Sequence, residues 1–136
     1  MEKIFSTISM LLGVIGGIIC NWLGGFDLLL KTIIALVILD YATGIFKGIY
    51  EKKLSSEIGF KGILKKIMIF IVIATAWTIQ KLLGEAVALR EIVIMFFVVN
   101  EALSLLENAA VLIPIPDKLK ETLLQLRDKE DTDNDR

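Results

Sequence analysis

The chain has 136 residues, of which 55% are hydrophobic, and carries a net charge of −1 with one cysteine and no histidine. These counts exclude an intramolecular disulfide, a cysteine-cluster metal site and ordinary histidine chemistry. The acidic balance argues against a nucleic acid partner. The sequence also lacks a phosphate-binding loop, a nucleophile–base pair and metal-ligand spacing, so we expect neither an enzyme nor a cofactor.

Apolar residues gather in four blocks that approach the roughly 20 residues needed to cross a hydrocarbon core. These blocks are residues 4–23, 28–46, 67–83 and 92–113. They predict an all-α integral membrane protein with a transmembrane domain over residues 1–116. The first block lacks a small-residue cleavage site, so we expect a retained helix rather than a signal peptide. If it fails to insert, three spans remain.

Small residues form one face of the first block. Gly13 and Gly17 make a GxxxG pair, and Gly16 and Gly24 lie on the same face. Such faces let membrane helices approach closely, either within one subunit or between subunits. The short Gly24–Gly25 link predicts a tight hairpin between the first two spans.

The second block carries an acidic residue near mid-membrane. Asp40 shares one side of the predicted helix with Thr43, Gly44 and Lys47. Asp40 could pair locally with Lys47 or Thr43 and hold the bundle together. It could instead line a water-filled path or set the stability of a closed assembly.

Residues 47–66 predict a short amphipathic cytoplasmic loop. Ser55 and Ser56 could cap a short interfacial helix, and Gly59 and Gly62 would weaken its middle. The loop is either a solvated determinant of topology or a surface for anionic headgroups. Its lysines are Lys47, Lys52, Lys53, Lys61, Lys65 and Lys66.

The fourth block carries a polar stripe. At about 100° per residue its five polar side chains fall within roughly 120° of arc. An ionisable group at bilayer depth costs on the order of 2–3 kcal/mol. The stripe therefore predicts either static hydrogen bonds between helices or a face for oligomer contacts and pore lining. Its members are Asn100, Glu101, Ser104, Glu107 and Asn108.

Pro114 and Pro116 end the fourth block. After them we expect a second region, residues 117–136, with a short cytoplasmic helix over 117–126 and a disordered, mostly acidic tail from Asp128. With four spans, twelve basic residues lie on the side of both termini and three on the other side. This asymmetry predicts cytoplasmic termini in a bacterial cytoplasmic membrane protein.

Two patterns resemble the toxin secretion/phage lysis holin family. One is Asn100-Glu101-x-Leu103-Ser104-x-x-Glu107-Asn108 followed by Pro114-x-Pro116-x-x-Leu119. The other is Asp40-x-x-Thr43-Gly44 followed by Leu54-Ser55-Ser56, Gly59, Gly62 and Lys65-Lys66. The resemblance covers residues 28–126.

The resemblance implies a homo-oligomer that accumulates harmlessly in the membrane. At a set time, or on collapse of the membrane potential, it would form lesions. These would release an endolysin or a large toxin without binding it tightly. The alternatives are a small ion channel or transporter subunit that uses Asp40 and Glu101, and a membrane scaffold protein whose basic loop binds lipid or a partner.

Overall fold

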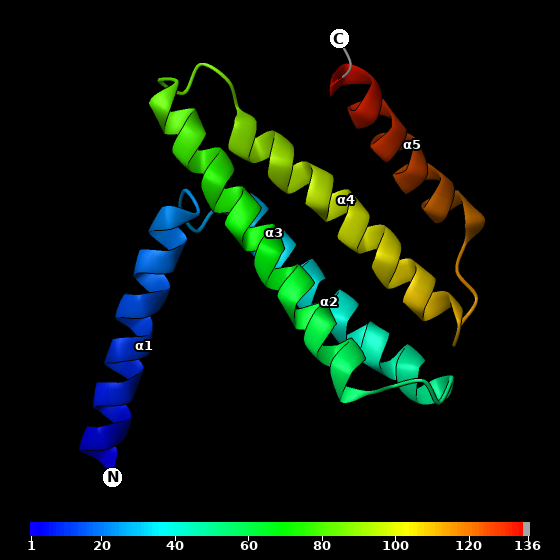
Figure 1. Cartoon of the computed structure of the whole chain (residues 1–136), viewed down its shortest axis with the longest axis horizontal. Helices are drawn as coiled ribbons and strands as arrows, with labels where there is room; N and C mark the ends of the chain where they lie inside the picture. The colour runs from blue at the N-terminus through cyan, green and yellow to red at the C-terminus, as the bar shows by residue number, and fades with distance from the viewer. Residues whose placement is uncertain (135–136) are drawn as a thin grey trace.

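The computed structural model describes residues 1–134 and has five α-helices over that range, with no strand among the described residues (Figure 1). This confirms the all-α prediction. The helices are α1 (Glu2–Trp22), α2 (Leu28–Tyr50), α3 (Ser56–Leu82), α4 (Leu89–Ala110) and α5 (Asp117–Asn134).

The core lies between α2, α3 and α4, where α4 packs against both other helices. Its buried side chains recur at helical spacing on α2 and α3, as expected for apolar stripes that face one another, and α4 contributes Ile94. The remaining surface of α2 and α3 is mostly apolar and exposed. The buried core residues are Leu23, Leu30, Ile33, Val37, Ile69, Ile73 and Ile94.

Side-chain caps begin two of these helices. The Asp27 carboxylate accepts a hydrogen bond of 3.0 Å from the Leu30 amide at the start of α2. The Ser55 hydroxyl accepts one of 3.2 Å from the Ile58 amide at the start of α3. Each bond satisfies an amide that has no partner within the first helical turn. The predicted cap at Ser55 is confirmed.

The helix that Ser55 starts is much longer than expected. α3 runs without interruption from Ser56 to Leu82, so the predicted loop over 47–66 is wrong and shrinks to residues 51–55. Gly59 and Gly62 do not break it because Tyr41 of α2 packs over them. The Tyr41 hydroxyl donates to the Gly59 carbonyl at 3.3 Å, and a Cβ on Gly62 would lie 3.2 Å from the Tyr41 ring.

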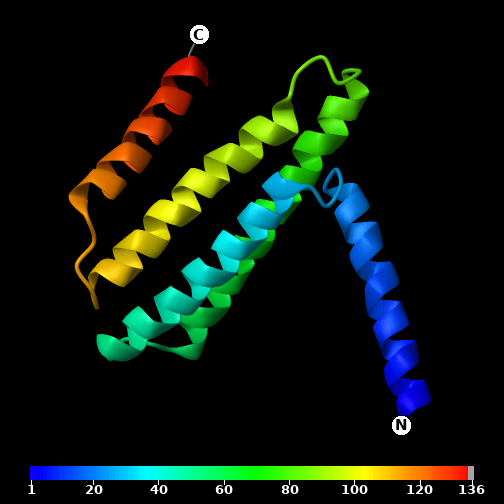
Figure 2. The ribbon, with the colours of Figure 1, turned by 180° about the vertical axis from the view of Figure 1, so that it is seen from behind.

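The predicted hairpin of the first two spans is also wrong. α1 points away from the other helices, contacts α3 near the link, and has no buried residue (Figures 1 and 2). Gly24 and Gly25 do form a tight turn, with φ of +90° and +104°, which glycine adopts without strain. The turn carries α1 away from α2 instead of folding it back.

Three helices, α1, α2 and α3, are long and apolar enough to cross a membrane. α4, which carries the polar stripe, is not among them. The count of four spans therefore stays a prediction.

α5 lies alongside α4 and runs antiparallel to it (Figures 1 and 2). The predicted helix over 117–126 is present, and it continues to Asn134, which corrects the predicted disorder of residues 128–134. Helix formers such as Lys and Glu follow Pro116 with no further proline or glycine to stop them. Residues 135–136 of the predicted tail lie outside the described residues.

Candidate functional site

Three charged side chains meet in the interior of the bundle, one from each helix. Asp40 of α2 and Glu101 of α4 are only 6% and 7% exposed. The Lys66 ammonium of α3 lies between them and donates a hydrogen bond to a carboxylate oxygen of each. We call Asp40, Lys66 and Glu101 the ion cluster.

Asn108 extends the ion cluster along α4. Its amide nitrogen donates to the Asp40 carboxylate at 3.0 Å, to the Asp40 carbonyl at 3.2 Å and to the Thr43 hydroxyl at 3.2 Å. Gly44 lies beside this contact, since a Cβ there would lie 3.6 Å from the Asn108 nitrogen, an ordinary van der Waals distance. Thus Asn108 joins α4 to α2 directly, and Lys66 joins the two helices through α3.

The ion cluster ties three helices together through a single cation. Moving charges out of water costs several kcal/mol per ion, and the cost is recovered only where each charge has close partners. Loss of the lysine charge would leave two buried carboxylates facing each other. The ion cluster can therefore fix how α2, α3 and α4 pack, and it can act as a point where separation of the helices is resisted.

A cavity of about 470 Å³ lies beside the ion cluster, toward the α2–α3 turn. Asp40, Lys66, Ser104 and Asn108 contribute to its polar wall, and Lys65 is one of the exposed side chains at its rim. The cavity offers water a route to the ion cluster from that end of the bundle.

The members of the predicted polar stripe of α4 lie in different surroundings. Glu101 and Asn108 point into the bundle, and Ser104 lines the cavity. Asn100 donates to the Phe96 carbonyl of its own helix at 2.9 Å, and Glu107 is exposed. The stripe spans a wide arc of α4, so the side chains at one edge face the bundle and those at the other edge do not.

Lys66 was placed in a loop that would face either water or lipid headgroups, and the structure corrects this. Because α3 begins at Ser56, Lys66 lies three helical turns into it and reaches Asp40. Local pairing of Asp40 with Lys47 or Thr43 was one of the alternatives for that residue. The Thr43 hydroxyl bonds to backbone carbonyls at Leu39 and Asp40. The other lysines of the predicted loop lie on the surface except Lys47, which is half-buried: Lys52, Lys53, Lys61 and Lys65 are exposed.

The predicted packing glycines divide into two groups. A Cβ added to Gly24 would clash with the Arg90 side chain, and one added to Gly44 would contact Asn108. A Cβ added to Gly13, Gly16 or Gly17 of α1 would meet nothing within 4 Å, so their face is open in the single chain.

Sequence reasoning missed a second polar site, at the opposite end of the bundle. Arg90 is 1% exposed and donates two hydrogen bonds to the Asp27 carboxylate, of 2.8 and 3.0 Å. It also donates to the carbonyls of Leu23 and Gly25, and its own amide donates to the Gln80 side chain at 2.7 Å. We call this set the arginine clamp. The available signal was an arginine at the start of the fourth apolar block together with one aspartate, Asp27, in the link between the first two blocks.

The clamp perturbs Asp27, which lies outside the spanning helices. The Arg90 guanidinium lowers the pKa of the Asp27 carboxyl from 3.8 to about 2, mainly through their hydrogen bonds. The clamp thereby joins the α1–α2 turn to the start of α4.

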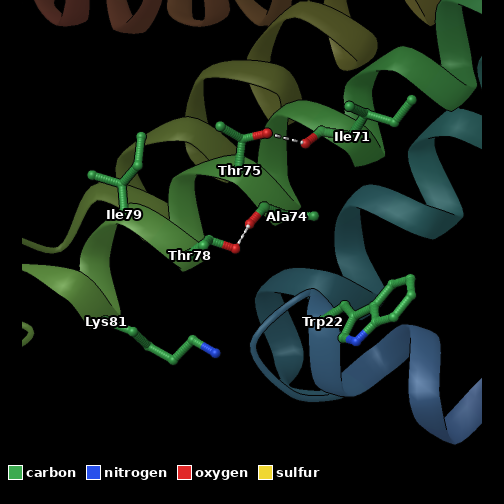
Figure 3. A pocket seen from close by; sticks show the side chains of 7 residues that line it. All are labelled: Trp22, Ile71, Ala74, Thr75, Thr78, Ile79 and Lys81. Carbon is green, nitrogen blue, oxygen red and sulfur yellow. Dashed lines mark hydrogen bonds between the residues drawn. The ribbon is translucent and has the colours of Figure 1, made fainter.

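Another hollow, of about 450 Å³, lies between Trp22 at the end of α1 and one side of α3 (Figure 3). The hydroxyls of Thr75 and Thr78 line it, but each donates back to its own helix at 2.8 Å. Lys81, at the edge of the hollow, lies 5.6 Å from the centre of the Trp77 ring. This hollow has little polar chemistry to offer, and the ion cluster remains the better candidate site.

Comparison with known proteins gives one family. The sequence profile of the bacteriophage holin family matches residues 17–128. An uncharacterized 14.9 kDa protein of Clostridium perfringens is 39% identical over 133 residues, which cover 95% of this chain and 99% of that protein. An uncharacterized protein of Listeria monocytogenes is 40% identical over 115 residues, 82% of each chain. No solved structure matches.

Proposed function

Since the chain belongs to the bacteriophage holin family, we propose that it oligomerises in the bacterial cytoplasmic membrane and forms timed lesions there. The lesions would release an endolysin or a large toxin. The observation that carries this proposal is the ion cluster, which keeps three charged groups inside a bundle with an apolar outer surface.

Separating helices exposes these charges only at a high cost in lipid, but at a low cost where water can reach them. The ion cluster therefore favours a closed bundle until copies gather and water enters between them. The cavity beside Asp40 and Lys66 supplies a starting point for that hydration.

Self-association would use a surface that is free in the single chain. The face of Gly13, Gly16 and Gly17 on α1 is open, and such faces support close packing of membrane helices. Membrane lipid is the other partner. The released enzyme or toxin would pass through the lesion without a dedicated binding site.

The ion cluster and its cavity also favour a second candidate, a small channel that passes ions only. The two functions differ in what crosses the membrane. A channel would depolarise the cell but retain a folded enzyme in the cytoplasm.

The test is inducible expression in a bacterium, with and without a cytoplasmic endolysin that lacks a signal peptide, followed by culture turbidity. We expect abrupt lysis only when both proteins are present. Depolarisation without release of the enzyme would favour the ion channel. No effect at confirmed membrane levels would contradict both and favour a scaffold.

A further inference from the structure

α5 covers the face of α4 that lies opposite the ion cluster. Val99 and Leu103 are 3% and 4% exposed but are not part of the core formed with α2 and α3. At about 100° per residue they lie roughly 160° around α4 from Glu101. Among the described helices, α5 is the one that packs against α4 on that side, and Leu123 and Leu124 are its half-buried leucines.

This contact lies at the level of the ion cluster. Glu101 sits between Val99 and Leu103 along α4, and it bonds to Lys66 of α3. Because α4 packs along α2 and α3, α5 lies beside the middle of two helices that are long and apolar enough to span the membrane.

The outward face of α5 differs from the mostly apolar exposed surface of α1, α2 and the later part of α3. α1, α2 and α3 expose apolar side chains such as Leu12, Phe46 and Phe60, each more than half exposed. More than half of the residues of α5 are charged, and its exposed side chains include Lys120, Glu121, Gln125, Asp128 and Lys129. Each charge at the bilayer centre would cost about 2.5–3.5 kcal/mol in lipid. That face requires water.

We infer that α5, docked on α4, forms the water-facing wall of the open lesion. The inference rests on the proposed function and says which surface lines the lesion. The polar stripe of α4 does not supply that wall by itself, because Glu101 and Asn108 are bonded within the bundle. α5 runs back along α4 from the Pro114–Pro116 turn, so it would enter the lumen from the side of that turn.

The first experiment modifies the proposed wall in reconstituted vesicles that hold dextrans of several sizes. Cys20→Ser removes the native thiol, and Gln125→Cys then places a single thiol on the exposed face of α5. We expect a bulky maleimide to slow release of the largest dextran at least several-fold. Lys53→Cys, in the exposed α2–α3 turn, is the control, and its modification should leave release unchanged.

A second pair of variants tests docking itself. Leu123→Ala combined with Leu124→Ala weakens the contact with α4, whereas Leu126→Ala changes an exposed leucine of the same helix. We expect the double variant to insert in the membrane but to release only small dextrans, and Leu126→Ala to behave as the unchanged chain does.

The outcomes separate the two proposals. If the unchanged chain releases no dextran, the proposed function fails, and the inference fails with it. If it releases dextran but complete labelling at position 125 has no effect, the inference alone is wrong. Faster release by the double variant would also overturn it, since α5 would then be a cover that must leave.

Discussion

Lys66 is the cation on which both buried carboxylates of the ion cluster depend. Lys66→Met would leave Asp40 and Glu101 without it, and breaking a buried ion pair costs about 3–5 kcal/mol. We expect a clear fall in Tm in detergent micelles. Lys65→Met, at the exposed neighbouring position, should have little effect. Equal losses in the two variants would contradict the role assigned to the ion cluster.

Asp27 and Arg90 make a prediction about pH. The folded-state pKa of Asp27 is about 2, below its ordinary 3.8, so its ion pair stabilises the fold above about pH 4. That contribution is lost as the pH falls through 3.8 toward 2. Because the Asp27 side chain is 47% exposed, screening limits it to roughly 1 kcal/mol.

Asp27→Asn removes the charge of the ion pair but keeps the helix cap, since asparagine also caps helices well. We expect the variant to have a lower Tm than the unchanged chain at pH 7, and we expect this difference to shrink as the pH falls from 3.8 to 2. A difference between the two proteins that is equal at pH 7 and near pH 2 would show that the Asp27 charge is not the cause.

At the scale of the element, the turn between α1 and α2 allows the cost of backbone strain to be compared with the cost of a side-chain clash. Gly24 and Gly25 both have positive φ, but a Cβ on Gly24 would clash with the Arg90 side chain, while a Cβ on Gly25 meets open space. Gly25→Ala should cost on the order of 1 kcal/mol for its backbone conformation. Gly24→Ala should cost more and lower the Tm further. Similar losses would argue against a closely packed arginine clamp.

Two of the glutamates of α4, Glu101 and Glu107, should also differ in their effects. Glu101 belongs to the ion cluster and Glu107 is exposed. We expect Glu107→Gln to shift the onset of lysis with little change in Tm, because it alters a surface that other copies or water can contact. Glu101→Gln should change both. Unchanged lysis timing for Glu107→Gln at matched expression would remove Glu107 from the lesion.

The helices themselves could be predicted from the sequence, because apolar blocks of membrane length leave few alternatives. The hydrogen-bond and ion-pair partners of their polar groups could not be predicted from the sequence. Lys66 lies 26 residues from Asp40 and 35 from Glu101, so their meeting depends on how three helices pack. The length of α3 was missed for a similar reason, since Gly59 and Gly62 are sites of contact with Tyr41 rather than breaks.

For the whole molecule, the same contacts bear on the number of spans. Glu101 bonds to Lys66, and Asn108 bonds to Asp40, so α4 lies along α2 and α3 for much of their length. If α2 and α3 cross the membrane, α4 crosses with them, and its Glu101 and Arg90 are paired within the bundle. With α1 inserted, four spans place residue 2 and the turn after α4 on the same side.

Single cysteines in a Cys20→Ser chain would test this before lysis begins. An impermeant thiol reagent added to intact cells should label Glu85→Cys, in the α3–α4 link, and should spare Glu2→Cys and Leu112→Cys. Leu112 is exposed in the turn after α4 and reports on α4 without depending on α5. Labelling at position 112 but not at 2 would mean that α4 does not cross. Labelling at position 2 but not at 112 would mean that α1 does not insert.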